Sequence, residues 1–257
     1  MAYIEIKNIC KSYPVQGSTT EKLEVLRNLN LSIEKEEFVC IFGPNGSGKT
    51  TLLNLVAGLL PPDKGKITIS GNPPGKVKSS FIFQNFEETL LPWRTCLDNI
   101  AFPLEVNEMS RKEARKKIVA YLDKTQAELP LNQFPYQLSG GQKQLLVIYR
   151  ALIFQPKLFL LDEPFNALDY DMRTSMEEKL LSIWGDNRIT TLFVSHEVDE
   201  AIYLSDRVIV LSCLPAEIIA DIKVDLKRPR TLEVLKTEEY SELRNSILSA
   251  FREGYRR

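Results

Sequence analysis

Residues 43–50 of the chain read Gly-Pro-Asn-Gly-Ser-Gly-Lys-Thr, which matches the phosphate-binding pattern G-x-x-x-x-G-K-[ST]. Its glycines allow the backbone to curl until successive N–H groups point inward at phosphate oxygens. The continuous apolar run over 37–43 predicts a buried strand before the loop, and residues 49–58 predict a helix after it. A loop between a buried strand and a helix N-terminus suits the phosphates of a nucleotide, so we interpret it as a binding site and not as an ordinary turn.

Individual side chains of this loop are expected to contact the phosphates or the metal ion of a bound nucleotide. Lys49 is expected to reach the β- and γ-phosphates, and the Thr50 hydroxyl is expected to ligate Mg²⁺. The residues expected to contact the nucleotide are Gly43, Pro44, Asn45, Gly46, Ser47, Gly48, Lys49, Thr50 and Thr51.

Two carboxylates follow another apolar run. Residues 158–161 (Leu-Phe-Leu-Leu) predict a buried strand that ends on Asp162 and Glu163. Neighbouring residues of a strand point in opposite directions, but at the strand end the two carboxylates can serve two parts of one site. Asp162 is expected to hold the water shell of the metal, and Glu163 to polarise an attacking water. The pair is a weak signal alone, but together with the phosphate loop it favours a nucleotide hydrolase.

Two further polar signals lie at the ends of predicted elements. Ser139 precedes a helical run as an N-cap, and Gly140 and Gly141 expose backbone N–H groups at that helix N-terminus, which suits an anion. His196, the only histidine of the chain, follows an apolar strand that ends at Ser195. We therefore expect His196 to lie at the end of a core strand, as we expect for Asp162 and Glu163.

The rest of the chain alternates between predicted strands and helices, which favours an α/β fold around a largely parallel sheet. The predicted strands cover 3–9, 23–34, 37–43, 66–69, 80–84, 157–162, 189–195, 206–212 and 216–222. Helical signal dominates over 86–156, where Ser110 is a predicted helix N-cap and another helix is expected over 139–154. The tail over 231–251 carries an apolar stripe at helical spacing, which we expect to pack on the domain and not in a partner's groove. The members of this stripe are Tyr240, Leu243, Ile247 and Phe251.

The composition is that of an ordinary globular protein. Lys and Arg number 33 and Asp and Glu 34, so the net charge is -1, and the strongly basic balance of a duplex-DNA binder is missing. We therefore expect no nucleic acid partner. No apolar run approaches the roughly 18 residues of a membrane span, and the N-terminus lacks the apolar core of a signal peptide. The 4 cysteines lie far apart without a CxxC pair, which argues against a zinc site and a disulfide framework.

Taken in this order, the motifs resemble those of the nucleotide-binding subunit of ABC transporters. Residues 43–50 resemble its Walker A motif, and residues 158–163 its Walker B motif. Residues 138–142 (Leu-Ser-Gly-Gly-Gln) are similar to the family signature LSGGQ in every letter. The signature is specific, because it marks this family among the phosphate-loop ATPases.

The resemblance implies further roles. Gln84 corresponds to the Q-loop glutamine, residues 166–169 to the D-loop, and His196 to the switch histidine. Tyr13 stands where the family places an aromatic residue that stacks on adenine. The Mg²⁺ ligands implied in this way are Thr50, Gln84 and Asp162.

The resemblance extends from about residue 3 to residue 225 and implies a fold. This fold is a phosphate-loop NTPase core of the ABC ATPase type, with an antiparallel β subdomain and an inserted α-helical subdomain. The implied domains are an ABC ATPase domain over 1–228, with its helical subdomain at about 86–156, and a C-terminal helical tail over 229–257.

Finer features resemble the ATPases of nitrate, sulfonate, taurine and bicarbonate importers, a subfamily that includes importers of thiamine-pyrimidine precursors. These features are residues 90–93, 164–169, 200–207 and 228–230. The sequence also departs from the family pattern, since relatives usually carry Arg, Arg, Ala and Ser at four of its positions. The residues found there are Lys143, Leu145, Tyr149 and Asn166. The departures bear on rates and dimer contacts and leave the ATPase assignment intact.

The implied activity is ATP hydrolysis that energises the uptake of a small solute. In the implied head-to-tail homodimer, each of two ATP molecules lies between the Walker A motif of one subunit and the signature of the other. Lys49, Glu163 and His196 are the implied catalytic residues, with Glu163 as general base and His196 on the γ-phosphate. The residues implied to act on the partner's ATP are Ser139, Gly140, Gly141 and Gln142.

The implied partners are a dimeric membrane permease and, through it, an extracellular or periplasmic solute-binding protein. These partners place the chain on the cytoplasmic face of the cell membrane. The permease contact is expected over 86–100, where Leu90, Leu91 and Trp93 form an apolar group. The solute itself is not readable from this chain, because selectivity resides in the partners.

Three alternatives remain open at this point. The first is an ABC-family ATPase that serves another membrane process, such as lipoprotein release or division; residues 90–93 and 228–230 argue against it. The second is a DNA-repair ATPase of the same superfamily, which would need a long coiled-coil insertion between Gln84 and Leu138. The third is a nucleotide-binding module that does not hydrolyse ATP, against which the intact Glu163 argues.

Overall fold

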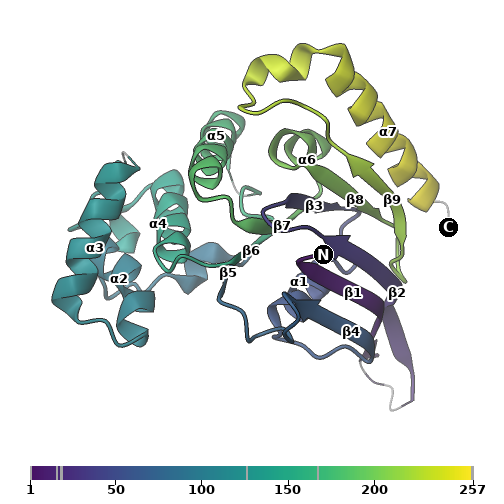
Figure 1. The fold of residues 1–257 in the computed structure, drawn as a ribbon, viewed down its shortest axis with the longest axis horizontal. Helices are drawn as coiled ribbons and strands as arrows, with labels where there is room; N and C mark the ends of the chain where they lie inside the picture. The colour runs from purple at the N-terminus through teal and green to yellow at the C-terminus, as the bar shows by residue number, and fades with distance from the viewer. Residues whose placement is uncertain (1, 16, 18–19, 126, 167, 256–257) are drawn as a thin grey trace. The chain divides into compact units, whose positions relative to one another are not determined.

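The computed structural model describes residues 2–15, 17, 20–125, 127–166 and 168–255, and it divides into two compact units (Figure 1). The first unit comprises Met1–Ser79, Leu158–Asp162 and Arg188–Arg257, and the second comprises Ser80–Lys157 and Glu163–Asn187. Ala167, within the expected D-loop, and the last two residues of the expected tail lie outside the described residues. The domain boundary at residue 228 stays a prediction.

The core of the first unit is a sheet with the strand order β6-β7-β3-β8-β9. The strands are Leu158–Asp162 (β6), Thr190–Ser195 (β7), Phe38–Phe42 (β3), Arg207–Leu211 (β8) and Ile218–Lys223 (β9). The first four run parallel, and β9 runs antiparallel to β8. Every residue of β3, β6 and β7 is buried, which explains why these strands read as continuous apolar runs. The predicted α/β fold is confirmed.

The register of this sheet brings chain ends together at one edge. Phe42, the last residue of β3, lies opposite Ser195, the last residue of β7. Asp162, the last residue of β6, pairs one residue earlier on β7. Because parallel strands end at the same edge, the loop 43–50, Asp162 and His196 all belong to that edge, where ligands bind in open α/β sheets.

A second, antiparallel sheet has the order β2-β1-β4. Its strands are Ile4–Pro14 (β1), Lys22–Ile33 (β2) and Lys64–Ile69 (β4). Leu29, Leu31 and Ile33 are buried at alternate positions of β2, with polar or exposed residues between them, so one face packs on the core. This sheet confirms the expected antiparallel β subdomain.

The helices of the first unit include α1 (Lys49–Ala57), α6 (Val198–Leu204) and α7 (Glu238–Tyr255). The tail stripe packs on the unit as expected, since α7 contacts α6, β8 and β9 (Figure 1). Tyr240 and Ile247 are buried, and the Phe251 ring lies 5.3 Å from the ring of Phe42, centroid to centroid. The helical periodicity over 231–251 is interrupted at its start, where Leu232–Lys236 forms a 3-10 helix.

The second unit begins with most of β5 (Ser79–Ile82) and is otherwise helical. Its α-helices are Cys96–Val106 (α2), Arg111–Lys124 (α3), Gly140–Leu152 (α4) and Tyr170–Asn187 (α5). Short 3-10 helices span Phe86–Thr89 and Pro135–Gln137. Ser110 caps α3 as predicted, in a capping box with Glu113. Helix α2 packs against α3 and α4.

Two sequence-based expectations need correction. Helix α6 was not predicted, because all of its residues except Asp199 are buried and it has no amphipathic stripe. The last strand begins at Ile218 and not at 216, since Ala216 instead forms an isolated bridge with Leu26. Among the described helices, none is long and apolar enough to cross a membrane.

Candidate nucleotide-binding site

The loop 43–50 is shaped as a cradle between β3 and α1. Gly46 and Gly48 have backbone φ angles of 78° and 90°, which glycine adopts without a steric penalty. A Cβ on Gly46 would meet nothing within 4 Å, so this side of the loop is open. A Cβ on Gly48 would lie 2.7 Å from Cγ1 of Val25, so only glycine fits against β2.

Polar groups inside the cradle are available to an anion. Lys49 is 5% exposed, and its Nζ donates to the carbonyls of Gly43 and Pro44, each at 3.0 Å. Ser47 is buried, and its Oγ has no hydrogen-bond partner among the described residues. Helix α1 has no side-chain cap at Gly48, so its first N–H groups are not capped by a side chain. A buried cation, a buried hydroxyl and a helix N-terminus fit the phosphates of a nucleotide.

Tyr13 lies beside this cradle. Its hydroxyl is 3.4 Å from Oγ1 of Thr51, in the first turn of α1, and its ring lies 5.7 Å from Nζ of Lys11. The side chain is half-buried, so one part of the ring is accessible. Its place next to the phosphate loop fits the expectation that it stacks on the base of the nucleotide.

Asp162 and His196 lie at the same edge of the sheet as the cradle. Asp162 is 2% exposed at the end of β6. His196 follows β7 with its side chain 28% exposed, and its Nε2 is 3.9 Å from a carboxylate oxygen of Glu197. In the first unit the loop 43–50, Asp162 and His196 thus lie at one edge of the sheet, and Tyr13 contacts the first turn of α1. Their roles toward a nucleotide stay predictions.

Glu163 belongs to the second unit, where two amides hold its carboxylate. Nε2 of Gln84 and Nδ2 of Asn166 each donate to Oε2 of Glu163, both at 3.3 Å. Glu163 has a backbone φ of 44°, a left-handed conformation that costs a non-glycine residue roughly 1–2 kcal/mol. Such strain is typical of residues whose orientation serves a function.

The expected metal ligands offer only oxygen. Thr50 supplies a hydroxyl, Asp162 a carboxylate, and Gln84 an amide oxygen that is not used in its bond to Glu163. Among the described residues, no group of three or more His, Cys, Asp or Glu side chains could hold a metal ion. Hydroxyl, carboxylate and amide oxygens are ligands that suit Mg²⁺, which is usually held by one or two protein oxygens together with substrate phosphates.

The signature segment begins α4 in the second unit. Ser139 caps the helix: its Oγ accepts from the N–H of Gln142 at 3.3 Å, and Oε1 of Gln142 accepts from the N–H of Ser139 at 3.0 Å. Ser139 and Gly140 are exposed. A Cβ on Gly141 would overlap the sulfur of Met172, which explains why this position is glycine. The segment presents a capped helix N-terminus at the surface.

The sequence departures have local explanations in this unit. Nζ of Lys143 pairs with a carboxylate oxygen of Glu87 at 2.6 Å. Tyr149 is fully buried, with its ring 6.2 Å from that of Tyr121 in an edge-to-face contact, so its bulk fills the helical core. Asn166 binds Glu163, as described above; the sequence alone did not indicate this contact. Nothing in the structure explains Leu145.

Gln144 links two parts of the second unit and was not singled out from the sequence. It is 1% exposed, and its Nε2 donates to the carbonyl oxygen of Pro164. This bond ties α4 to the segment that carries Glu163 and Asn166. The burial of this amide, which normally implies a specific partner, is visible only in the structure, so the sequence carries no signal for it.

Comparison with known proteins gives a consistent picture. The family model described as "ABC transporter" matches residues 26–166. The bicarbonate transport ATP-binding protein CmpD of Synechocystis sp. is 36% identical, over 96% of this chain and 88% of that protein. The aliphatic sulfonates import ATP-binding protein SsuB of Bacillus thuringiensis is 38% identical, over 98% of this chain and 96% of that protein.

Solved structures agree with these relatives. A dimeric ATP-binding cassette in a post-hydrolysis state, bound to ADP and Pi, superposes with a TM-score of 0.74 at 31% identity. The match covers 87% of this chain and 100% of that chain. The range 26–166 that the family model matches contains the phosphate loop, the signature and both carboxylates. The chain therefore belongs to the ABC transporter family, as an ATP-hydrolysing subunit of the importer type.

Proposed function

We propose that this ATPase works as a homodimer on the cytoplasmic face of the cell membrane and energises a permease that imports a small oxyanion. An extracellular or periplasmic solute-binding protein would deliver the anion to the permease. The similarity to sulfonate and bicarbonate transport proteins supports this solute class, since both solutes are small oxyanions. The observation that carries the ATPase part is the phosphate cradle over 43–50, with its buried Lys49.

In the proposed complex the first unit binds the nucleotide. Lys49 and the N-terminus of α1 hold the β- and γ-phosphates, and the buried Oγ of Ser47 donates to a phosphate oxygen. Tyr13 stacks on adenine. Thr50, Gln84 and Asp162 would hold Mg²⁺, which neutralises charge on the phosphates when it is bound.

Proposed hydrolysis depends on Glu163 as the general base. Its carboxylate accepts a proton from the attacking water, while the amides of Gln84 and Asn166 fix the orientation of Oε2. His196 donates a hydrogen bond to the γ-phosphate. These residues act on a substrate that is already oriented by the cradle, which reduces the entropy cost of the reaction.

The proposed dimer supplies donors across the subunit interface. The exposed N-terminus of α4, with residues 139–142, faces the nucleotide of the partner and stabilises its γ-phosphate. The dimeric form of the similar cassette supports this arrangement. One subunit alone then lacks part of the groups that stabilise charge, and it is expected to be a poor enzyme.

Replacing Lys49 by alanine tests the ATPase part of this proposal. The change removes the buried cation of the cradle, so we expect weaker ATP binding and a loss of turnover of at least about 100-fold. The fold should survive, because the loop keeps its glycines. Phosphate release and the thermal midpoint are measured side by side, with Lys64→Ala, an exposed lysine of β4, as the control. Near-normal turnover in Lys49→Ala would contradict the assignment.

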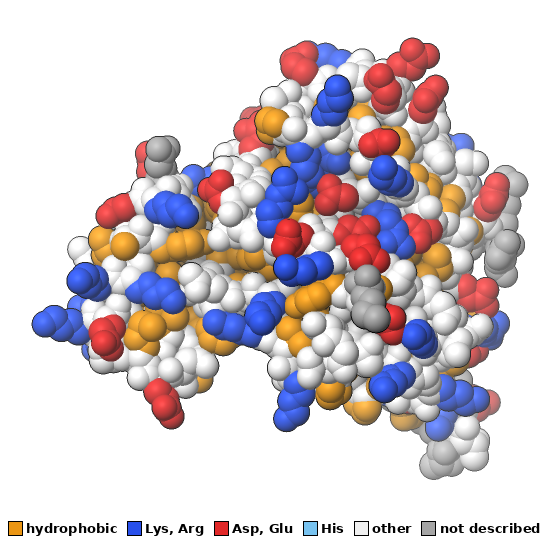
Figure 2. All heavy atoms as spheres, viewed as in Figure 1, with side chains coloured by type: hydrophobic (Ala, Val, Ile, Leu, Met, Phe, Trp, Pro, Cys, Tyr) orange, Lys and Arg blue, Asp and Glu red, His pale blue; other side chains and the backbone are white. Residues whose placement is uncertain are grey.

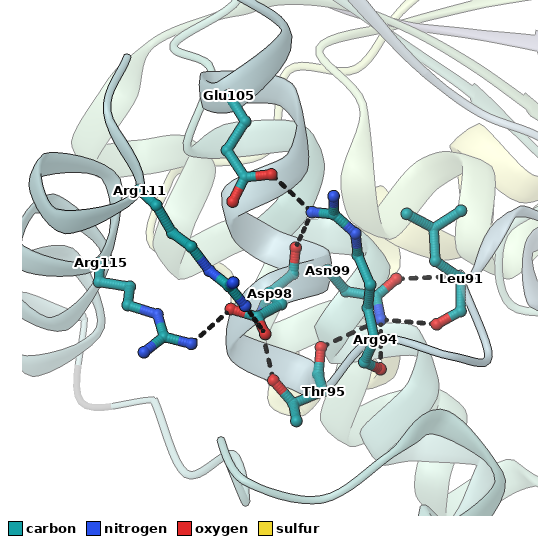
Figure 3. Close-up of polar contacts among 8 residues, drawn as sticks. All are labelled: Leu91, Arg94, Thr95, Asp98, Asn99, Glu105, Arg111 and Arg115. Atoms are coloured by element: carbon teal, nitrogen blue, oxygen red, sulfur yellow. Dashed lines mark hydrogen bonds and ion pairs between the residues drawn. The ribbon is translucent and has the colours of Figure 1, made fainter.

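The segment 91–95 is held rigidly in the second unit (Figure 3). Asn99 is fully buried, and its Oδ1 accepts from the N–H of Leu91 at 2.9 Å. Its Nδ2 donates to three carbonyl oxygens, at 3.0 Å to Leu91, 3.0 Å to Arg94 and 3.1 Å to Thr95. The bonds of this single amide to both ends of the segment thus fix the backbone of residues 91–95.

Charged side chains brace the helix that carries Asn99. The Asp98 carboxylate accepts from Arg111 at 2.7 Å and from Arg115 at 2.8 Å, and Arg94 pairs with Glu105 at 2.6 Å (Figure 3). The two arginines lower the pKa of the Asp98 carboxyl, although burial opposes this change.

Elsewhere, on the face drawn in Figure 2, basic and acidic side chains are interspersed.

The braced segment presents Trp93 to solvent. Trp93 is 73% exposed, whereas Leu90 is only 6% exposed. Of the apolar group expected at the permease contact, Leu90 therefore packs into the core of the unit, and Trp93 is exposed. We propose Trp93 as the anchor for the permease, since an exposed and rigidly held tryptophan is the residue type that most often dominates interface energies.

The variant Trp93→Ala tests this anchor. We expect unchanged basal ATPase activity and folding, but weaker binding to permease-containing vesicles by about 30-fold, the effect of losing roughly 2 kcal/mol at an interface hot spot. Tyr255→Ala, at 65% exposure in α7, is the control for loss of an exposed aromatic. Equal binding by wild type and Trp93→Ala would exclude the anchor role.

A further inference from the structure

The backbone around His196 is tied to α6. Oγ of Ser195 donates to the carboxylate of Glu200, in the first turns of α6. The N–H of Glu197, the N-cap residue of that helix, donates back to Oγ of Ser195 at 2.9 Å. His196 lies between these two residues, so a displacement of α6 also displaces His196.

Helix α6 depends on contacts with the rest of the unit for its stability and position. It has 7 residues, and helices of this length are marginal in water without tertiary contacts. Its last four carbonyl oxygens have no acceptor role within the helix and need donors from elsewhere. The first of them, that of Ala201, accepts from the N–H of Ser205 at 3.2 Å.

The donors for the remaining carbonyl oxygens come from two arginines of the segment 226–230. Nη1 of Arg230 donates to the carbonyl oxygens of Ile202 at 3.0 Å, Tyr203 at 3.0 Å and Ser205 at 2.7 Å. Nη2 of Arg228 donates to that of Leu204 at 2.6 Å. Ser205 and this pair of side chains thus cap the C-terminal end of α6.

The charge of Arg230 also suits this place. Arg230 is 7% exposed, and a cation at a helix C-terminus is favoured by the helix dipole. Burial and the neighbouring Arg228 lower the pKa of the Arg230 guanidinium to about 10, so it stays protonated at neutral pH. Nε and Nη2 of Arg230 donate to the carbonyl oxygen of Leu226, at 3.4 Å and 3.2 Å, which fixes the plane of the guanidinium.

Helix α7 contacts the opposite end of α6 (Figure 1). The hydroxyl of Tyr240 and Nε of Arg244 donate to Oδ1 of Asp199, in the first turn of α6, at 2.5 Å and 2.7 Å. Asp199 and Arg244 are about half exposed, so this pair contributes less than the buried Arg230. Both ends of α6 are nevertheless bound by residues C-terminal to position 225.

We infer that Arg230 is a positioning residue for His196, because it caps α6 and α6 fixes the backbone on both sides of the histidine. The inference rests on the proposed role of His196 at the γ-phosphate and extends it to the C-terminal part of the chain. Arg230 itself is not proposed to touch the nucleotide. It acts by holding the imidazole where the γ-phosphate is bound.

The test uses Arg230→Gln and the more conservative Arg230→Lys, with Lys227→Gln as the control. Lys227 is an exposed cation of the same segment, and it makes none of the bonds to α6. Because His196 is the only histidine, its imidazole signals in proton NMR are unambiguous. We expect these signals to shift or broaden in Arg230→Gln, less so in Arg230→Lys, and not in Lys227→Gln.

Turnover provides the second readout in the full-length protein. Arg230→Gln is expected to lower kcat about 10-fold with the KM for ATP nearly unchanged, since small misplacements of a catalytic group reduce rate more than binding. In a His196→Ala background the same substitution is expected to have no further effect on kcat, because Arg230 is inferred to affect the rate only through the position of His196. A structural effect alone would instead reduce kcat equally in both backgrounds.

The outcomes separate this inference from the proposed function. Unchanged imidazole signals and kcat in both Arg230 variants would overturn the positioning role. A wild-type rate in His196→Ala would overturn the proposed role of the histidine. The imidazole signals of His196 in the Arg230 variants would still test whether Arg230 positions this side chain. If Arg230→Gln fails to fold, the NMR signals and kcat are both measured on Arg230→Lys, which retains the cation.

Discussion

Replacing Glu163 by glutamine is expected to lower the rate of ATP hydrolysis by about 10²- to 10⁴-fold, the usual effect of losing a general base. Glutamine keeps the size of the side chain and one oxygen, but it has no basic carboxylate. ATP binding should persist, because Lys49, Thr50 and Asp162 are unchanged. With ATP bound and not cleaved, the closed dimer should accumulate, and size-exclusion chromatography with ATP should show a dimer for the variant and mostly monomer for the wild type.

The matched control for this variant is Asp162→Asn, which changes the neighbouring carboxylate. Asp162 is proposed to hold Mg²⁺, so its loss should reduce Mg²⁺-dependent ATP binding itself and no dimer should accumulate. Two results would contradict the division of labour between these carboxylates: hydrolysis by Glu163→Gln at the wild-type rate, or loss of ATP binding by Glu163→Gln to the same extent as by Asp162→Asn.

The structure adds a reason to expect a large effect at Glu163. Its carboxylate accepts from two amides, those of Gln84 and Asn166, in a backbone conformation that is strained for a glutamate. The strain and the two donors fix one orientation of the side chain. A fixed base loses little entropy when it accepts a proton, so its removal cannot be compensated by a neighbour that is less well placed.

Much of the fold was predictable because its decisive signals are local. Strands β3, β6 and β7 are buried on both faces, so each gives an uninterrupted apolar run. The residues that follow these strands, in particular Asp162 and His196, then had to lie at one edge, because parallel strands end together. The cradle over 43–50 is likewise encoded by glycines whose positive φ angles are a local property.

Other features depend on contacts between distant residues and give no local pattern. Helix α6 is buried at every residue except Asp199, so its sequence resembles a core segment and not an amphipathic helix. The amide of Asn166 reaches Glu163 only because the chain turns between them, and the burial of Leu90 depends on the packing of the second unit. The role of Arg230 as a helix cap likewise depends on the positions of three separate carbonyl oxygens.

The proposed dimer combines, in each catalytic site, the phosphate loop of one subunit with the signature of its partner. It predicts that two inactive variants restore each other's function. A Lys49→Ala subunit has an intact signature, and a Ser139→Arg subunit has an intact phosphate loop, so their heterodimer contains one complete site. Random mixing places half of the subunits in heterodimers with one working site each, so activity should reach about one quarter of the wild-type value.

Ser139→Arg also removes the N-cap of α4, which can cost about 1 kcal/mol of stability. The chain offers a matched control in Ser110→Arg, because Ser110 caps α3 in a capping box of the same kind. This control should keep wild-type activity if loss of a cap is harmless to catalysis. It separates loss of the cap from the steric and charge effect of arginine at the signature.

The measurement is the rate of phosphate release by the equimolar mixture of Lys49→Ala and Ser139→Arg, compared with each variant alone at the same total concentration. We expect activity in the mixture that is many times that of either parent and close to a quarter of the wild type. A mixture no more active than its parents would contradict the claim that Ser139 acts on the nucleotide bound by the partner.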